Sequence, residues 1–527
     1  MSDDRRGGAG PWIGATAVAL VGVCAAYAWV SEDAHITFRT IDNFVNGHGL
    51  RWNIDERVQT YTHPLWLLVN SIPYFFTREI YFTTASIGLV FSVGAYVQLA
   101  RMRSGSPLDL VVGLFVPLVL SVSFVRYATS GFETSLTFLL LAIFAGVLTR
   151  CLRDERVSWL ALTLVPALAA INRLDTTLLY VPGLAVVAWH HRSNLRWGLV
   201  VLGALPFALW AAFASFYYGF VLSNTALAKL NHEIPPTEYL EQGFVYLGDL
   251  LASDPVSFLW LASAWVVVAW FAGERLRGRE AAIDAGVALA LGSVIYSVYV
   301  LLVGGDFLTG RFWVPAVFAA ICGFATRSEP IPMAWRSLSR RGVVGLAAAA
   351  LCLSGVWLLV RTPLRDLARE QGIRDRALAH RFLGRDLRWG ATERYRTLAE
   401  LGRAVRAEAE ATGSTKPIPT FAIGVFGFEA GPRITIVDLN ALADPLLARL
   451  PPDPREHWMI GHFGRAAPAG YLHARETGST DRMEPGLAEY YEHLRHVTSG
   501  PLWDTERLAT IAAFHLGRYD ALLPTAP

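Results

Sequence analysis

The chain has 527 residues, of which 53% are hydrophobic, and its mean hydropathy is +0.36. This composition is too apolar for a soluble protein of several domains and is typical of a polytopic membrane protein. The formal net charge of +2 is uninformative as a total, because the charges are segregated between loops. We therefore expect the lipid bilayer as a partner and no nucleic acid.

Apolar segments recur from the N-terminus to about residue 360. About eleven of them are long enough, or nearly long enough, for a bilayer crossing, which takes ~20 apolar residues. They lie near residues 11–30, 80–100, 107–125, 134–149, 157–171, 175–190, 196–217, 257–272, 281–303, 312–326 and 343–360. The shorter segment 64–76 contains Pro73, so we interpret it as a helix resting on the membrane surface. Residues 1–360 form the predicted transmembrane α-helical domain.

The distribution of arginine predicts the orientation. With the N-terminus in the cytoplasm, every predicted cytoplasmic loop is basic, as the positive-inside rule requires. These loops carry Arg5, Arg6, Arg101, Arg103, Arg150, Arg153, Arg156, Arg192, Arg196, Arg275, Arg277, Arg279, Arg327, Arg336, Arg340 and Arg341. The bias toward arginine and alanine suggests a bacterial source. We predict a multi-pass protein of the bacterial plasma membrane, with its other loops outside.

The loop after the first span, residues 31–79, is polar and rich in charge. We expect Ser31 to cap a helix and Glu32 and Asp33 to lie in its first turn, where the helix dipole favours carboxylates. At ~100° per residue the apolar and polar side chains separate, which predicts an amphipathic helix near an interface with Arg39 on its polar side. Asp33 lies on neither side and is not neutralised by Arg39. The structural alternative is that Asp33 only decorates the helix start.

Three further outer loops carry isolated charges. Glu133 ends a Ser-Gly-Phe-Glu sequence that fits a capping box at a helix start. Arg173 and Asp175 flank a tight turn, where they either pair with each other or contact a ligand. Asp306 and Arg311 lie in GGDFLTGR, where a span leaves the membrane. A cation at the start of the next span is costly unless Asp306 or a ligand anion satisfies it.

The long outer loop 217–244 contains Asn224 and Lys229 in the sequence SNTALAK. Lys229 is one of two lysines in a chain that otherwise uses arginine. A compact ammonium suits a point contact with phosphate, although a chance substitution explains it equally well.

Residues 361–527 have ordinary soluble composition and predict a small exported α/β domain. We expect helices near 391–411 and 504–516 and strands at 421–428 and 433–439.

The gathering of charges on the outer face is consistent with glycosyl transfer. Outside the cytoplasm the sugar must arrive on a lipid phosphate, because soluble nucleotide sugars stay inside. The phosphate leaves easily and needs cations, whereas the attacking hydroxyl needs a carboxylate as base. A transporter of lipid-linked sugars, or flippase, is the alternative, since intramembrane charges also mark transport pathways. A structural membrane protein would not need charges gathered on one face.

The sequence from Asp33 to Trp66, DAHITFRTIDNFVNGHGLRWNIDERVQTYTHPLW, resembles a pattern of bacterial arabinofuranosyltransferase-like proteins. These belong to the GT-C superfamily of polyprenyl-phosphate-sugar glycosyltransferases. The resemblance continues through SGFET, NRLD, SNTALAK, GGDFLTGR and the C-terminal VDLNALADPLLARLP and GHFGRAAPAGY. The sequence departs at Glu32, where such proteins often have Asp, and at His35, where Tyr or Phe is usual.

The resemblance implies a GT-C-like fold and transfer of a sugar, such as arabinofuranose, from a polyprenyl-phosphate donor to a glycan or glycoprotein acceptor of the cell envelope. By position in the motif we assign the base to Asp33, with Glu32 as the alternative. The predicted donor-phosphate ligands are Lys229, Arg311 and Arg173. The predicted substrate-binding residues are Arg39, His63, Glu133, Asp175, Asn224 and Asp306. The resemblance assigns no cofactor with certainty, and a divalent metal ion is left open.

Overall fold

The computed structural model describes residues 10–103, 106–153, 157–279, 282–326, 393–413, 416–453 and 458–524, and the single positions 342, 349 and 352. The chain forms two compact units, each assembled from three stretches of sequence. Unit 1 comprises Met1–Val30, Thr84–Phe207 and Pro236–Phe382. Unit 2 comprises Ser31–Thr83, Ala208–Pro235 and Leu383–Pro527. This grouping differs from the predicted division at residue 360, because the first external loop belongs with the C-terminal residues.

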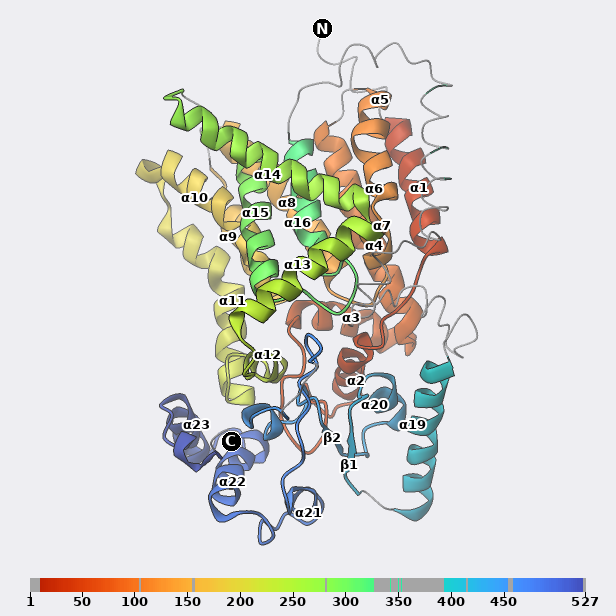
Figure 1. Ribbon diagram of the computed structural model, residues 1–527, viewed down its shortest axis with the longest axis vertical. Coiled ribbons are helices and arrows are strands. Elements are labelled where there is room, and N and C mark those ends of the chain that lie inside the picture. Colours follow the sequence, from red (N-terminus) through yellow and green to blue (C-terminus); the bar gives the residue numbers. More distant parts are fainter. Residues whose placement is uncertain are drawn as a thin grey trace. The chain divides into compact units, whose positions relative to one another are not determined.

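Helices dominate unit 1 (Figure 1). In the described part of the chain, five helices are long and apolar enough to cross a membrane. They are α4 (Ile80–Arg103), α8 (Thr134–Arg153), α11 (Trp197–Tyr218), α14 (Pro255–Leu276) and α15 (Ala285–Leu302). The last residues of α11 and the first of α4 belong to unit 2. The chain is therefore a helical protein of membrane-protein character, and the total of eleven spans stays a prediction.

The other helical elements of this region are shorter or less apolar. They are α1 (Gly10–Ala26), α5 (Pro107–Leu110), the π-helical turn η1 (Val111–Phe115), α6 (Val116–Leu120), α7 (Val122–Tyr127), α9 (Trp159–Asn172), the 3-10 helix η2 (Leu174–Leu179), α10 (Val181–His190), the 3-10 helix η3 (Arg192–Asn194), α13 (Pro236–Ser253) and α16 (Val314–Ala325). Helical segments thus lie at every predicted span except 343–360, which falls largely outside the described residues.

Helix α13 corrects part of the sequence analysis, which assigned residues 217–244 to a loop. Tyr239, Tyr246 and Leu250 are buried on one side of α13, whereas several of its other residues are exposed. Such a helix has no continuous apolar run, so hydropathy alone did not reveal it.

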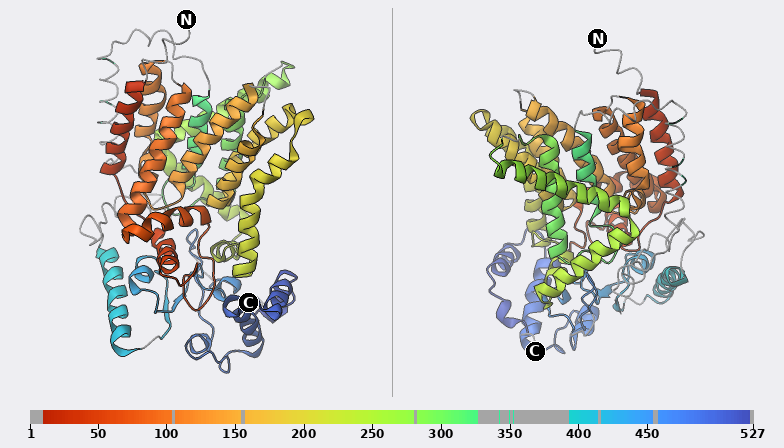
Figure 2. Two further views of the ribbon diagram at one scale, coloured as in Figure 1. Left: turned by 180° about the vertical axis from the view of Figure 1, so that it is seen from behind. Right: turned by 45° about the horizontal axis from the view of Figure 1, so that its top comes forward.

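The core of unit 1 lies where α7, α8, α15 and α16 come together (Figures 1 and 2). The rings of Phe124, Phe138 and Phe318 are mutually stacked or tilted, with centroids 4.8 to 5.8 Å apart. On α15, a Cβ at Gly292 would lie 2.3 Å from the carbonyl oxygen of Leu179. Only glycine permits this close approach, which holds η2 against α15.

Unit 2 contains a small parallel sheet in which β1 (Ile418–Thr420) pairs with β2 (Ile436–Asp438). Its helical elements are α2 (Ala34–Val45), α3 (Pro64–Thr77), α12 (Asn224–Leu230), α19 (Glu393–Thr412), α20 (Val425–Ala430), the 3-10 helix η5 (Leu447–Arg449), α21 (Tyr471–Thr477), α22 (Pro485–Ser499), α23 (Thr505–His515) and the 3-10 helix η6 (Asp520–Leu522). The helices predicted near 391–411 and 504–516 and the strand predicted at 433–439 are present. The strand predicted at 421–428 is wrong, because this segment enters α20 and β1 precedes it.

One core of unit 2 explains why the first loop groups with the C-terminal residues. Ile36 and Trp52 of the loop pack with Phe426 and Ile436 of the C-terminal stretch in a single buried cluster. Burial of apolar surface is the main favourable term in folding, so these two distant stretches stabilise each other.

Helix α3 covers the segment that we interpreted as a membrane-surface helix. Trp66 and Tyr74 are buried, whereas Ile72, Phe75 and Phe76 are exposed. One apolar side of α3 is therefore not covered by other residues, as expected for a helix that lies on a membrane surface. Contact with the bilayer itself stays a prediction.

Candidate functional site

The predicted site residues fall into one group in each unit. Unit 1 contains Glu133, Arg173, Asp175, Asp306 and Arg311. Unit 2 contains Glu32, Asp33, Arg39, His63, Asn224 and Lys229.

In unit 1, Arg173 pairs with two carboxylates. Its Nη1 donates to Glu133 Oε1 at 2.7 Å, and its Nε lies 2.8 Å from Asp175 Oδ1. Its guanidinium also lies 4.3 Å from the ring centre of Phe312. The tight-turn pair with Asp175 is therefore confirmed. Glu133 joins it from 40 residues away, an ion pair that the local capping-box pattern did not predict.

Arg311 is paired much more loosely than Arg173. Its Nη1 lies 3.4 Å from Asp306 Oδ2, and its guanidinium is 3.7 Å from the ring centre of Phe132. Its buried Nε donates no hydrogen bond within the described part of the chain. A buried donor with no acceptor is unfavourable, so Arg311 is the cation of this group with capacity left for a ligand anion.

The loop that carries Asp306 and Arg311 is held by glycines and tyrosines. Gly304 and Gly305 follow α15 with φ of 73° and 74°, a left-handed conformation that glycine adopts without strain. Tyr246 donates to the carbonyl of Leu308 at 2.9 Å and accepts from the backbone N–H of Phe312 at 3.1 Å. These contacts fix the loop between two helices and so fix Arg311.

Unit 1 therefore brings three carboxylates and two guanidiniums together beside the rings of Phe132 and Phe312. Asp175 also accepts from the hydroxyl of Tyr296 on α15 at 3.2 Å. Sequence analysis missed Tyr296 and the rings of Phe132 and Phe312, because aromatic residues in or beside spans look like ordinary core. For Tyr296 a signal existed, since a buried tyrosine hydroxyl usually finds a partner.

In unit 2, the two acids at the start of the first loop differ. Glu32 Oε1 accepts from the backbone N–H of Val425 at 3.2 Å. A Cβ at Gly424 would lie 2.7 Å or less from Glu32, so the glycine is needed there. Asp33 is half-buried at the N-cap position of α2, and its side chain makes no capping hydrogen bond. No ion pair or hydrogen bond to its carboxylate is present among the described residues.

Two expectations about α2 are corrected. The helix begins at Ala34 with Asp33, not Ser31, at the N-cap position. It is also not a surface helix, because nine of its twelve residues are buried. Arg39 is 1% exposed, and its guanidinium donates to the carbonyls of Trp52, Gly427 and Ile434. Its donors are used by the protein, which contradicts the predicted substrate contact.

The histidines of the first loop are buried beside α2. His35 Nδ1 lies 3.0 Å from the carbonyl oxygen of Ser31, and its ring contacts Phe38 and Phe428 edge-on. Burial lowers the pKa of His35 to about 4, so the ring is neutral at pH 7. A neutral ring explains how His occupies a position where aromatic residues are usual. His63 Nε2 lies 2.8 Å from Thr37 Oγ1.

The amide nitrogen of Asn224 is also used by the protein, and the predicted substrate contact of this residue stays a prediction. Its Nδ2 lies 2.9 to 3.1 Å from the carbonyl oxygens of Ala441, Leu442 and Asp444. It therefore fastens α12 to the C-terminal stretch. Lys229, in the last turn of α12, is half-buried near Gly461 and stays a candidate phosphate ligand.

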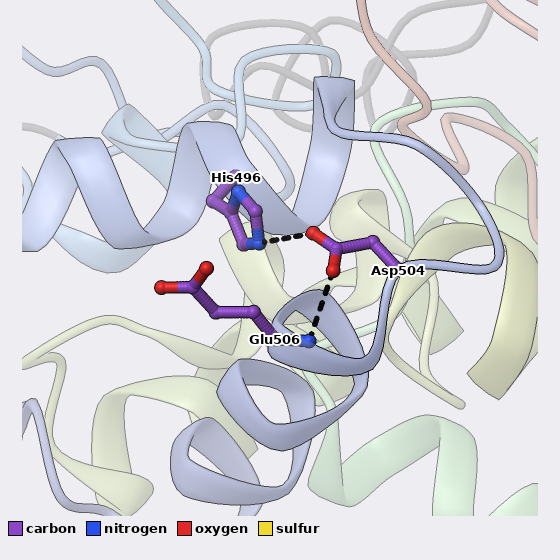
Figure 3. Close-up of side chains that lie close together, drawn as sticks. All are labelled: His496, Asp504 and Glu506. Atoms are coloured by element: carbon purple, nitrogen blue, oxygen red, sulfur yellow. Dashed lines mark hydrogen bonds and ion pairs between the residues drawn. The ribbon is translucent and has the colours of Figure 1, made fainter.

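The predicted acids do not form a metal centre in the described part of the chain. There, the one group of three possible ligands within 4.8 Å of one another is His496, Asp504 and Glu506 (Figure 3). His496 Nε2 lies 3.1 Å from Asp504 Oδ2, and Asp504 caps α23 by accepting from the backbone N–H of Glu506. These contacts are explained by the helix start, so the group needs no metal ion.

Two curated proteins are similar to this chain. A terminal β-(1→2)-arabinofuranosyltransferase of Corynebacterium glutamicum is 28% identical over 389 residues, which cover 63% of this chain and 52% of that protein. A terminal β-(1→2)-arabinofuranosyltransferase of Mycobacterium tuberculosis is 25% identical over 385 residues, which cover 66% of this chain and 60% of that protein. The chain thus spans between half and three fifths of the length of these relatives. No family model and no solved structure matches it.

Neither relative is named as a transporter, so the comparisons give no support to the transporter alternative. Both carry the activity that the first-loop pattern implied. The resemblance of this chain to bacterial arabinofuranosyltransferases is therefore confirmed.

Proposed function

We propose that the chain is a membrane glycosyltransferase of the GT-C type. It transfers arabinofuranose, or a closely related pentofuranose, from a polyprenyl-phosphate donor to a glycan or glycoconjugate of the cell envelope. The observation that carries this proposal is the similarity to two arabinofuranosyltransferases. The apolar helices suit a donor that diffuses in the bilayer. Reaction on the outer face follows from the predicted orientation of the loops.

In the proposed reaction, Asp33 accepts the proton of an acceptor hydroxyl while the oxygen attacks the anomeric carbon of the donor sugar. The bond between this carbon and the phosphate oxygen breaks, and the polyprenyl phosphate leaves with the electron pair. One carboxylate as base is enough, because phosphate is already a stable leaving anion. The charge that develops on the phosphate calls for a nearby cation.

Asp33 is preferred over Glu32 because of their different partners. A general base must keep a carboxylate oxygen available for the substrate proton. Glu32 accepts from the N–H of Val425, whereas no protein donor engages the side chain of Asp33 in the described part of the chain.

Arg311 is the preferred phosphate ligand. Its single long contact with Asp306 and its unused Nε leave donors for an anion. Arg173 is less suited, because Glu133 and Asp175 already neutralise it, and we assign it a positioning role. Lys229 is the candidate for a second phosphate contact.

The experiment compares Asp33→Asn with Glu32→Gln in purified full-length protein. Both variants remove one carboxylate with little change of shape. Asp33→Asn should lower turnover by ~10² to 10⁴, the usual contribution of a general base, and leave donor binding near the wild-type value. Glu32→Gln should be milder in turnover, because the amide oxygen still accepts from Val425.

The measurement is arabinose transfer from a synthetic polyprenyl-phosphate arabinofuranose, with the melting temperature as a control for folding. An inactive Glu32→Gln beside an active Asp33→Asn would move the base to Glu32. Near-normal turnover in both variants would refute the first-loop mechanism. Passage of the donor across a vesicle membrane without transfer would favour the transporter.

A further inference from the structure

Two aromatic rings of unit 1 lie against the two cations of its candidate site. The ring centre of Phe132 is 3.7 Å from Cζ of Arg311. The ring centre of Phe312 is 4.3 Å from Cζ of Arg173. Glu133, the residue after Phe132, pairs with Arg173, and Arg311 directly precedes Phe312. Each of these two dipeptides therefore contributes one charge and one ring to the same group.

The contact between Phe132 and Arg311 is close and shielded. Its 3.7 Å separation falls within the ~3.5–4.0 Å at which carbon atoms touch, so the guanidinium lies against the face of the ring. The ring is buried, and the side chain of Arg311 is 11% exposed. Little water reaches the contact, and the attraction between a cation and a ring is strongest under this condition.

A ring can hold an arginine without using its hydrogen-bond donors. All five N–H groups of a guanidinium lie in its plane, and none points out from its faces. Arg39 of unit 2 is held in the other way, because its Nε, Nη1 and Nη2 all donate to backbone carbonyls. The guanidinium of Arg311 forms one hydrogen bond within the described residues, 3.4 Å long, to Asp306. Phe132 is therefore its closest support, and this support leaves the donors at its edge for an anion.

Phe132 is itself fixed by its neighbours in sequence. Gly131 has φ of 83°, a left-handed conformation that glycine adopts without strain. On the other side, the fully buried Glu133 lies 2.7 Å from the guanidinium of Arg173. The ring between these two residues is a fixed surface against which a flexible arginine side chain can be ordered.

We propose that Phe132 is a positioning residue, which fixes the plane of Arg311 and so keeps its N–H donors in place for the donor phosphate. The identity of this anion rests on the proposed function, whereas the contact between ring and guanidinium does not. Without the ring, Arg311 would adopt several rotamers, and the anion would have to order the side chain as it binds. Ordering one such side chain weakens binding roughly 2- to 12-fold.

The test replaces Phe132 in the full-length protein by phenylalanines that carry one, two or three ring fluorines. Fluorine withdraws charge from the ring face and weakens its attraction for a cation, whereas the shape of the side chain changes little. Binding of farnesyl phosphate, which has the phosphate but no sugar, is titrated in detergent. Affinity should fall stepwise, by roughly 2- to 12-fold with three fluorines. The ¹⁹F resonance of the monofluorinated ring should shift when farnesyl phosphate binds.

Phe138 is the matched control. It is buried on α8 in the same unit, and its ring stacks on that of Phe124 at 4.9 Å. No guanidinium of the described residues lies over this ring. The same three replacements at Phe138 should leave the affinity and the ¹⁹F resonance unchanged. The melting temperature of each protein separates a loss of binding from a loss of the fold.

Unchanged affinity across the three replacements of Phe132 would overturn the proposal. So would an equal loss across the replacements of Phe138, or a wild type that does not bind farnesyl phosphate. A stepwise loss at Phe132 in a protein that transfers no arabinose would overturn only the proposed function. Transfer of arabinose together with unchanged affinity at Phe132 would overturn only the positioning role.

Discussion

Two sets of buried arginines bind different kinds of group, although the division does not follow the units throughout. Arg475 of unit 2 pairs with Glu56 and Asp55, and Arg103 of unit 1 donates to the carbonyl of Phe324. In unit 2, Arg39, Arg57, Arg465 and Arg507 donate to backbone carbonyls, and each joins stretches far apart in the sequence. In unit 1, Arg173 and Arg311 face carboxylates and aromatic rings.

The difference separates structural cations from candidate ligand-binding ones. Carbonyls already formed by the fold satisfy the donors of a guanidinium and leave little for a substrate. A buried guanidinium with one long contact leaves an N–H donor without an acceptor, which is unfavourable. An anion that accepts this hydrogen bond removes that cost. Burial alone therefore does not identify a functional arginine. The contrast between Arg173 and Arg311 lies in the length of their contacts and in the N–H donor that Arg311 leaves unused.

The largest expected effect is the loss of a carbonyl-bound arginine. Arg39→Met would leave the carbonyls of Trp52, Gly427 and Ile434 without their donors, so we expect a loss of unfolding free energy on the order of 3–5 kcal/mol. Thermal unfolding followed by tryptophan fluorescence measures it. Arg78→Met is the matched control, because Arg78 is exposed and should change stability by less than about 0.5 kcal/mol. A stable Arg39→Met protein that lost substrate binding would restore the predicted substrate role.

The two arginines of unit 1 should separate binding from stability. Arg311→Met should weaken binding of a polyprenyl-phosphate donor analogue by ~1.5–3 kcal/mol, the range for a charge-assisted hydrogen bond, with little change in melting temperature. Arg173→Met should instead lower the melting temperature, because Glu133 is 0% exposed and would lose its cation. Donor titration and thermal unfolding of both variants distinguish the roles. Equal melting-temperature losses would show that Arg311 is structural as well.

Local pattern predicted the parts of the fold that depend on neighbours in sequence. Hydropathy located the long spans, and helical periodicity located α19 and α23. Arg39 could not be interpreted in this way, since two of its acceptors lie 388 and 395 residues along the chain. The same holds for Tyr296, which reaches Asp175 across 121 residues.

The candidate site was predicted as a set of residue types and not as a set of contacts. The pairing of Arg173 with Asp175 followed from spacing, but its bond to Glu133 did not. The contrast between Glu32 and Asp33 depends on Val425, which the sequence places far from both. Loop charges can therefore be listed from sequence, whereas their availability depends on distant partners.

The smallest expected effect concerns His35, whose buried ring is neutral at pH 7. Protonation of His35 opposes folding, because burial lowers its pKa from 6.5 to about 4. Between these values the unfolded chain binds more protons than the folded chain, so this contribution to stability is complete above pH 6.5 and is lost as the pH falls toward 4. At pH 5 the loss of unfolding free energy is about 2 kcal/mol.

His35→Phe keeps an aromatic ring against Phe38 and Phe428 and cannot be protonated. Its melting temperature should therefore fall less between pH 7 and pH 5 than that of the wild type. Equal falls in melting temperature for both proteins over this range would mean that burial does not lower the pKa of His35.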